Sequence, residues 1–182
     1  MRFRIEFHGP FRVSSGRASD GLDATFDPRN PLPASSLKGL MRAHALNLLA
    51  LDLDLVDAVY GSPAARSPWS WSDAVIEDDV AAKSRSRTRI RIDPATFTAA
   101  DQAMTTAEEL WPTAASFHVR RRDPLDRVRS ELHEAVLAAS ARAITALGAD
   151  RRRGLGWVGI VPDRPWDNAQ HRLLAAHRRT HA

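Results

Sequence analysis

The chain contains no cysteine, only two lysines and no long apolar run. Without cysteine it has no disulfide and no thiolate zinc site, which is typical of a protein from a reducing cytoplasm. A membrane-spanning helix needs about 20 consecutive apolar residues. The N-terminal stretch Met1-Arg-Phe-Arg-Ile-Glu also lacks the apolar region of a signal peptide. These absences predict a soluble, cytoplasmic protein with no membrane partner.

Arginine carries nearly all of the positive charge. The chain has 26 basic and 22 acidic residues, a net charge of +4 and a pI near 10.5, and 24 of the basic residues are arginines. The planar guanidinium donates bidentately to phosphate and stacks on bases. We therefore expect anionic partners. A length of 182 residues with 43% hydrophobic content is enough for one core, so we expect a single domain over residues 1–182.

The first half of the sequence has a strand pattern followed by a helix pattern. Residues 1–13 alternate apolar and polar side chains, which predicts a half-buried strand that ends near Gly9-Pro10. Residues 14–33 are a long loop rich in Ser, Gly, Asp, Asn and Pro. Apolar residues at helical spacing then predict a helix over residues 35–49 and a short helix over residues 51–60.

The second half has the same elements in a different order. The patterns predict strands at residues 69–76 and 117–120, a helix over residues 131–147 that Gly148 ends, and a closing strand over residues 154–161. The total order is β-α-β-β-α-β. This is an α+β, ferredoxin-like (RRM-like) fold, a common platform for RNA.

Two further segments lie outside this pattern. Residues 83–110 begin with basic side chains that alternate with small or apolar ones, so we expect an extended ribbon inserted in the domain. Residues 163–182 are rich in Arg and His and are predicted to be a C-terminal tail with a short terminal helix.

The helix over residues 35–49 begins with a candidate phosphate-binding motif. Ser35 or Ser36 is a candidate helix cap, and Lys38 and Arg42 follow within two turns. Unpaired N–H groups and the macrodipole at a helix N-terminus favour an anion. We therefore predict that Ser35, Ser36, Lys38 and Arg42 contact RNA. A capped, solvated helix start is the alternative.

A second basic motif follows the helix over residues 131–147. Gly148 to Gly156 frames three consecutive arginines, and glycine lets backbone amides come close to an anion. This predicts an RNA contact made by the loop, against the alternative of a solvated charge run. The residues assigned to it are Arg151, Arg152, Arg153, Gly154 and Gly156.

The inserted ribbon carries a third set of arginines. Arg85, Arg87 and Arg89 alternate with small polar residues, and Arg91 continues the series. We predict RNA contacts here too. The alternative is a polar edge strand that prevents aggregation.

Four landmarks resemble those of the RAMP superfamily of CRISPR systems, and within it the backbone subunits of type III effector complexes. They are a loop containing Gly21-Leu-Asp that leads into Pro33-Ala-Ser-Ser-Leu-Lys-Gly, the segment Val59-Tyr-Gly with Trp71-Ser-Asp-Ala-Val, the ribbon around Arg91-Ile-Asp-Pro, and the Gly148–Gly156 loop. They occur in the family's order and cover most of the chain. The chain departs from the family pattern at Ala24-Thr25, where Asn-Pro is common, and at Ala34, where glycine is usual.

The resemblance implies a subunit that forms a filament of copies on CRISPR RNA, beside other effector subunits, and pairs this guide with target RNA. By motif position Asp23 is the catalytic residue that cleaves target RNA at regular intervals, and it binds Mg²⁺ or another divalent metal with help from Asp20 or Asp27. No organic cofactor is implied. The ribbon corresponds to the family's thumb, a β-hairpin that wedges into the guide–target duplex, with Ile92 and Met104 as its apolar residues.

Three functions remain open from the sequence. The first is the guided endoribonuclease, and the second is a structural RAMP subunit of the same complex that does not cleave. The third is a stand-alone endoribonuclease that processes CRISPR RNA, although such enzymes generally lack the Ser-Ser-Leu-Lys-Gly helix start. For Asp23 itself the plain alternative is an Asx-turn or an exposed loop acid.

Overall fold

Strand β1 (Arg2–Phe7) is a central strand of the main sheet, because it has a partner on each side. It pairs antiparallel with β6 (Ala114–Arg121) and with β7 (Val158–Pro162). Strands β2 (Trp69–Trp71) and β3 (Val75–Ile76) both pair antiparallel with β6. The computed structural model describes residues 1–16 and 21–178. The sheet order is therefore β7-β1-β6, with β2 and β3 along the outer edge.

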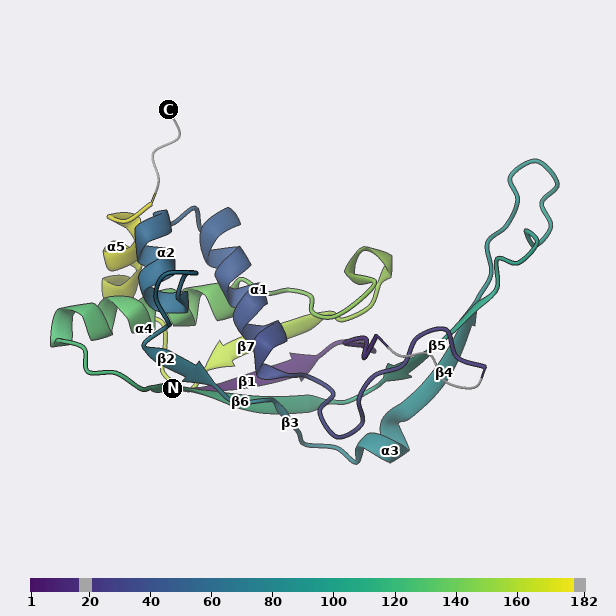
Figure 1. The fold of residues 1–182 in the computed structure, drawn as a ribbon, viewed down its shortest axis with the longest axis horizontal. Helices are drawn as coiled ribbons and strands as arrows, with labels where there is room; N and C mark the ends of the chain where they lie inside the picture. The colour runs from purple at the N-terminus through teal and green to yellow at the C-terminus, as the bar shows by residue number, and fades with distance from the viewer. Residues whose placement is uncertain (17–20, 179–182) are drawn as a thin grey trace.

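Helices cover one face of this sheet, as Figure 1 shows. Alternation along β1 buries Phe3 and Ile5 completely, and Phe3 stacks on Phe117 of β6 with 4.9 Å between ring centroids. The covering helices are α1 (Ala34–Asn47), α2 (Leu53–Tyr60), α4 (Arg127–Arg142) and α5 (Asn168–Ala175). The β-α-β-β-α-β order and the ferredoxin-like fold predicted from the sequence are confirmed.

A two-stranded sheet projects from the domain (Figure 1). The short helix α3 (Val80–Lys83) leads into β4 (Ser84–Arg89), which pairs antiparallel with β5 (Thr105–Leu110). It is inserted between β3 and β6, where the sequence predicted a ribbon over residues 83–110. We call residues 84–110 the projecting hairpin.

Several predicted boundaries are wrong. The first strand ends at Phe7, shortly before the predicted end near Gly9-Pro10. Helix α4 begins at Arg127, four residues before the predicted start, because the Asp126 side chain accepts a hydrogen bond from the Arg129 N–H and caps it. It also ends at Arg142, before the predicted Leu147, although Leu147 is buried.

The predicted serine cap of α1 is also absent. Pro33 is the N-cap, and its side chain cannot accept a hydrogen bond. Instead, the Asp73 carboxylate, from the loop between β2 and β3, accepts a 2.7 Å hydrogen bond from the Ala34 N–H. One of the N–H groups at this helix N-terminus is therefore already hydrogen-bonded to a carboxylate of the protein itself.

The predicted tail contains a helix that belongs to the domain. Helix α5 begins with a capping box between Asp167 and Gln170, and it buries Leu174 against the core. Residues 179–182, at the end of the predicted tail, lie outside the described residues. Among the described residues, no helix is long and apolar enough to cross a membrane.

Candidate nucleic-acid interface

A groove separates the projecting hairpin from the loop of residues 148–156. Its volume is about 710 Å³, and its lining includes backbone and small side chains such as Ala24, Ala103 and Thr105. Five arginines from three segments of the chain also line it, namely Arg12, Arg87, Arg89, Arg91 and Arg153. We call it the arginine groove.

The arginines of the hairpin reach the groove because of strand alternation. Successive side chains of a strand point to opposite faces, so Arg85, Arg87 and Arg89 share one face of β4. In the antiparallel register Arg85 lies opposite Glu109 and Arg87 lies opposite Ala107. Residues that face each other across such a pair lie on the same side of the sheet. The carboxylate of Glu109 is therefore on the arginine face.

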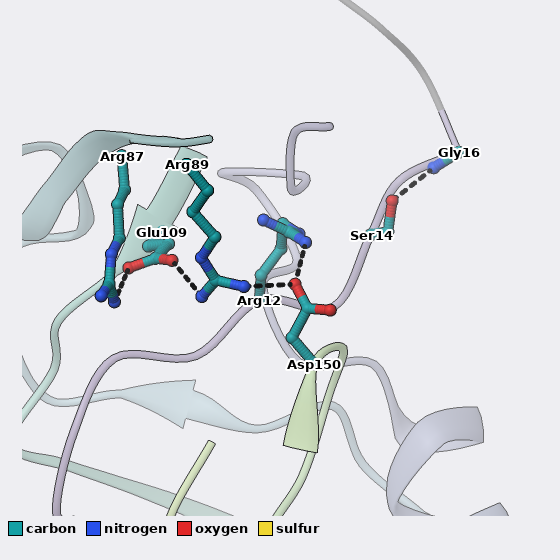
Figure 2. A network of polar contacts seen from close by, with 7 residues as sticks. All are labelled: Arg12, Ser14, Gly16, Arg87, Arg89, Glu109 and Asp150. Carbon is teal, nitrogen blue, oxygen red and sulfur yellow. Dashed lines mark hydrogen bonds and ion pairs between the residues drawn. The ribbon is translucent and has the colours of Figure 1, made fainter. Parts of the chain in front are cut away.

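Four ion pairs form one network beside the groove, and one of them, between Arg89 and Asp150, joins the hairpin to the basic loop (Figure 2). Asp150 Oδ2 accepts from Arg12 at 3.1 Å and from Arg89 at 3.2 Å. The second guanidinium nitrogen of Arg89 lies 3.4 Å from Glu109 Oε1, and Arg87 lies 3.8 Å from Glu109 Oε2. The network runs from the segment after β1, through the loop of residues 148–156, to both strands of the hairpin.

Two side chains of this network are buried, so the network contributes to the stability of the fold. Arg12 is 7% exposed and Glu109 is 1% exposed. Removing one partner of a buried pair leaves an uncompensated charge, which destabilises a protein strongly. Three arginines and two carboxylates also leave one net positive charge in the network. Within the described part of the chain, Arg85, Arg91 and Arg153 form no ion pair, so their charges are available to an external anion.

Gly154 and Gly156 of the basic loop have different roles. Gly156 has φ 76°, and a Cβ on it would lie 1.8 Å from the Leu147 carbonyl oxygen. Its N–H donates to the Pro10 carbonyl at 2.7 Å, so this amide is not free to bind an anion, contrary to the reason given for it from the sequence. Gly154 has φ 84° with open space around it. The exposed position of Gly154 is compatible with the predicted contact between this loop and a ligand.

The three arginines that precede Gly154 form a short 3₁₀ turn, Arg151–Arg153. All three are exposed. Asp150 precedes them in the left-handed conformation, with φ 55°. That turn directs the Asp150 carboxylate back to Arg12 and Arg89, while the three arginines face outward. They line a second open groove, together with His44 of α1.

The loop containing Asp23 is docked on the projecting hairpin. The Thr106 N–H donates to Asp23 Oδ2 at 2.8 Å, and the Asp23 N–H donates to the Thr106 carbonyl at 2.8 Å. The next residue, Ala24, forms a parallel bridge with Ala107 and lines the arginine groove. Asp23 is therefore an exposed carboxylate beside the groove, with one oxygen already hydrogen-bonded.

The described residues do not build a metal centre around Asp23. Across residues 1–16 and 21–178, no group of three or more His, Asp or Glu side chains is placed to hold a metal ion. The Oδ1 atom of Asp27 accepts from the Arg29 N–H within its own turn. Asp20, the other predicted helper, lies outside the described residues.

Helix α1 does not direct Lys38 and Arg42 at the arginine groove. The Lys38 ammonium lies 5.2 Å from the centroid of the Trp71 ring, and Arg42 forms a 2.7 Å ion pair with Asp57 of α2. Ser35, in the first turn, is exposed, and Ser36 is partly exposed. The α1 side chain next to the basic loop is His44 instead.

The predicted thumb residues lie on either side of the hairpin's distal loop. Ile92 is 50% exposed and Met104 is 68% exposed. Between them, Phe97 is 82% exposed with φ 56°, and its N–H donates to the Asp93 carbonyl. The Asp93 carboxylate accepts from two N–H groups of the same loop, which holds the pKa of this side chain below its usual value. Sequence reasoning missed Phe97, although an aromatic residue in a polar loop was a usable signal.

Comparisons with known proteins agree with this architecture. A family model described as the RAMP superfamily matches residues 4–159. No curated protein matches the chain. A similar solved chain comes from the "Cryo-EM structure of the Type III-B Cmr-beta bound to cognate target RNA", with a TM-score of 0.68 and 14% identity over 88% of this chain and 95% of that chain. That likeness shows a shared fold. Because the family model spans most of the sequence, the chain belongs to the RAMP superfamily.

Proposed function

We propose that the protein is an RNA-binding backbone subunit of a type III CRISPR effector complex, and that the arginine groove holds the guide RNA. The observation that carries this proposal is the convergence of five arginines from three chain segments on one groove. Guanidinium groups bind the phosphates of a nucleic acid without regard to its sequence, as a guide-binding subunit requires. The similar chain belongs to a complex bound to target RNA, which supports the same ligand class here.

In this proposal the unpaired arginines and the two carboxylates have separate roles. The exposed arginines at positions 151–153 and the unpaired Arg85 and Arg91 contact phosphates. Asp150 and Glu109 fix the other arginines and thereby set the distance between hairpin and loop. The distal loop with Phe97 extends beyond the groove, where it can meet the paired target strand. Further copies of the chain continue along the guide, beside other effector subunits.

We further propose Asp23 as the residue that supports cleavage of target RNA. Its carboxylate is exposed, lies next to the groove-lining Ala24, and keeps one oxygen available. A divalent metal at this position would have the Asp23 carboxylate as a ligand and would take its other ligands from RNA, because the described residues supply no set of three. Such an ion, Mg²⁺ for example, supplies charge stabilisation at the scissile phosphate. The chain's own contribution is to hold the carboxylate at a fixed place on the hairpin.

A subunit that binds RNA without cutting it is the second candidate. It is favoured by the two hydrogen bonds between Asp23 and Thr106, which give Asp23 a structural task near the distal end of the β4–β5 ladder.

The test uses the complex assembled on its guide RNA, with labelled complementary RNA and Mg²⁺. Asp23→Asn removes the charge and keeps an oxygen that accepts from Thr106, so the hairpin stays docked. Asp163→Asn, an exposed carboxylate that neither belongs to the Asp23 loop nor lines the arginine groove, is the matched control. Regularly spaced cuts that disappear only in Asp23→Asn support the guided nuclease.

The other outcomes separate the two proposals. Tight binding of target RNA without cuts in the natural protein makes it a structural subunit. If the natural protein incorporates no guide RNA at all, the RNA-binding function itself is refuted.

A further inference from the structure

A second cationic pocket lies on the side of α1 opposite the basic loop. In Figure 1 the chain between α2 and β2 lies on one side of α1, and residues 148–156 lie on the other. The pocket has a volume of about 270 Å³. Its lining includes three cations and three polar or aromatic side chains, namely Lys38, Arg66, Arg122, Tyr60, Ser62 and Trp69.

The three cations come from three different elements and have little acidic compensation. Lys38 projects from α1, Arg66 from the loop of residues 61–68, and Arg122 from the segment after β6. Within the described part of the chain, Lys38 and Arg122 form no ion pair. Arg66 forms one at 3.4 Å with Asp123, through a side chain that is 72% exposed. Exposed pairs of this kind contribute little, and no acidic residue lines the pocket itself.

The backbone around these cations is held in place. Gly61 has φ 82°, and a Cβ on it would lie 2.7 Å from the Ser67 nitrogen, so the turn accepts only glycine. The Ser67 hydroxyl donates to the Val59 carbonyl, and the Arg122 N–H donates to the Pro68 carbonyl. The loop is thus fastened to α2 at one end and to the segment after β6 at the other. A rigid cationic site loses less entropy when an anion binds.

The pocket also offers a hydroxyl donor and a rigid floor. Ser62 Oγ accepts from the Ala64 and Ala65 N–H groups, which leaves its proton to donate outward. Tyr60 and Trp69, both buried, form the floor. The Lys38 ammonium, held over the Trp71 ring, lies on the side of α1 that faces this pocket.

We propose that this pocket binds a phosphate group. Three cations and a hydroxyl match the charge and the acceptor oxygens of phosphate. The volume is below the roughly 300–1,000 Å³ of sites for drug-sized ligands, which favours a small group. The phosphate comes either from the RNA backbone, in which case the site extends the proposed RNA path past α1, or from a free anion. Only the first source rests on the proposed function.

The first experiment uses the full chain without RNA and inorganic phosphate as the probe. Phosphate replaces chloride at constant ionic strength while the melting temperature is measured. A ligand at tenfold its Kd is expected to raise the melting temperature of a chain of this length by about 3–6 °C. We expect this rise in the natural protein and its loss in Lys38→Ala/Arg122→Ala.

Arg121→Ala is the matched control, because Arg121 is the adjacent exposed arginine, donates to Ser130 and does not line the pocket. The single variant Arg122→Gln keeps the test valid if the double variant folds poorly, since this side chain is exposed and its backbone hydrogen bond is retained. No rise in the natural protein, or an equal rise in all variants, overturns the proposal.

A second arm identifies the source of the phosphate. If the protein saturated with RNA no longer responds to inorganic phosphate, an RNA phosphate occupies the pocket. If it responds as before, the ligand is a free anion. The two proposals can fail separately. If Lys38→Ala/Arg122→Ala leaves the phosphate response unchanged with and without RNA, while variants of Arg91 and Arg153 still weaken RNA binding, the phosphate pocket is refuted and the arginine groove is not.

Discussion

Gly156 lies so close to Leu147 that a Cβ at position 156 would overlap the Leu147 carbonyl oxygen, and the two residues bond to each other, the Leu147 N–H donating to the Gly156 carbonyl at 2.9 Å. The closure of the basic loop therefore depends on backbone packing within the protein. The same loop contains Gly154, which has open space on every side.

We expect substitutions at these two glycines to differ. Gly156→Ala combines left-handed strain with an overlap that the backbone must relieve, so the free energy of unfolding should fall by about 3–5 kcal/mol. Gly154→Ala adds only the conformational strain, about 1–2 kcal/mol. Urea unfolding followed by circular dichroism measures both. Equal losses at the two positions would contradict the packing argument.

Loss of the Asp150 charge should loosen the link between the loop and the hairpin. Asp150→Asn leaves Arg12 and Arg89 without their shared carboxylate, so we expect the protein to lose about 1–3 kcal/mol of stability. Amide hydrogen exchange in residues 84–110 should become faster. Asp101→Asn, in an exposed position of the hairpin, is the control and should leave exchange in β4 and β5 unchanged. Unaltered exchange in Asp150→Asn would show that backbone pairing alone positions the hairpin.

Arginines without acidic partners should dominate the salt dependence of RNA binding. Arg91→Ala and Arg153→Ala should each reduce the slope of log affinity against log salt by about 0.7 if the RNA is single-stranded. Arg164→Ala is the control, because Arg164 pairs with Glu134 on α4 and does not line the groove. Binding titrations at four salt concentrations give the slopes. A slope that stays constant in both groove variants argues against phosphate contacts at these positions.

Acidification should destabilise the fold through His133. The side chain is buried, and its Nδ1 accepts a 3.1 Å hydrogen bond from the Trp69 indole N–H. Burial lowers the pKa of His133, and the nearby Arg129 lowers it further. The unfolded chain thus binds a proton near pH 6.5 that the folded chain takes up only at lower pH.

Protonation of His133 lowers the stability of the fold. The stabilising contribution is complete above pH 6.5 and is lost as the pH falls from there through the folded pKa, with a slope of at most about 1.4 kcal/mol per pH unit. Unfolding measured between pH 7.5 and 5 should show this loss in the natural protein. It should be smaller in His133→Gln, which cannot take up the proton. An identical pH profile for both proteins would exclude His133 as its source.

Local patterns in the sequence were enough to predict most of the fold. Phe3 and Ile5 mark the buried face of the first strand, and Leu37, Met41 and Ala45 mark the buried face of α1. These patterns depend on the period of a single element, which a sequence displays directly. The start of α4 was missed because its cap, Asp126, lies in a charged stretch with no apolar period.

The candidate site could be predicted only in part. The basic loop and the arginines of the hairpin were visible as clusters, but the direction of Lys38 was not, because tertiary packing fixes how α1 is rotated on the sheet. Arg12, Asp150 and Glu109 were not identified. Arg12 and Asp150 are 138 residues apart, and no local pattern marks either as the other's partner. The pocket between Arg66 and Arg122 was missed for the same reason.

The long separation between Arg12 and Asp150 has a consequence during synthesis. A nascent chain that ends before residue 150 already carries Arg12, Arg89 and Glu109, yet it lacks both the carboxylate that joins the two arginines and the strand β7 that pairs with β1. Domains generally fold as units. The groove therefore takes shape only after the segment through β7 has left the ribosome, and a shorter nascent chain exposes these arginines without the geometry of the groove.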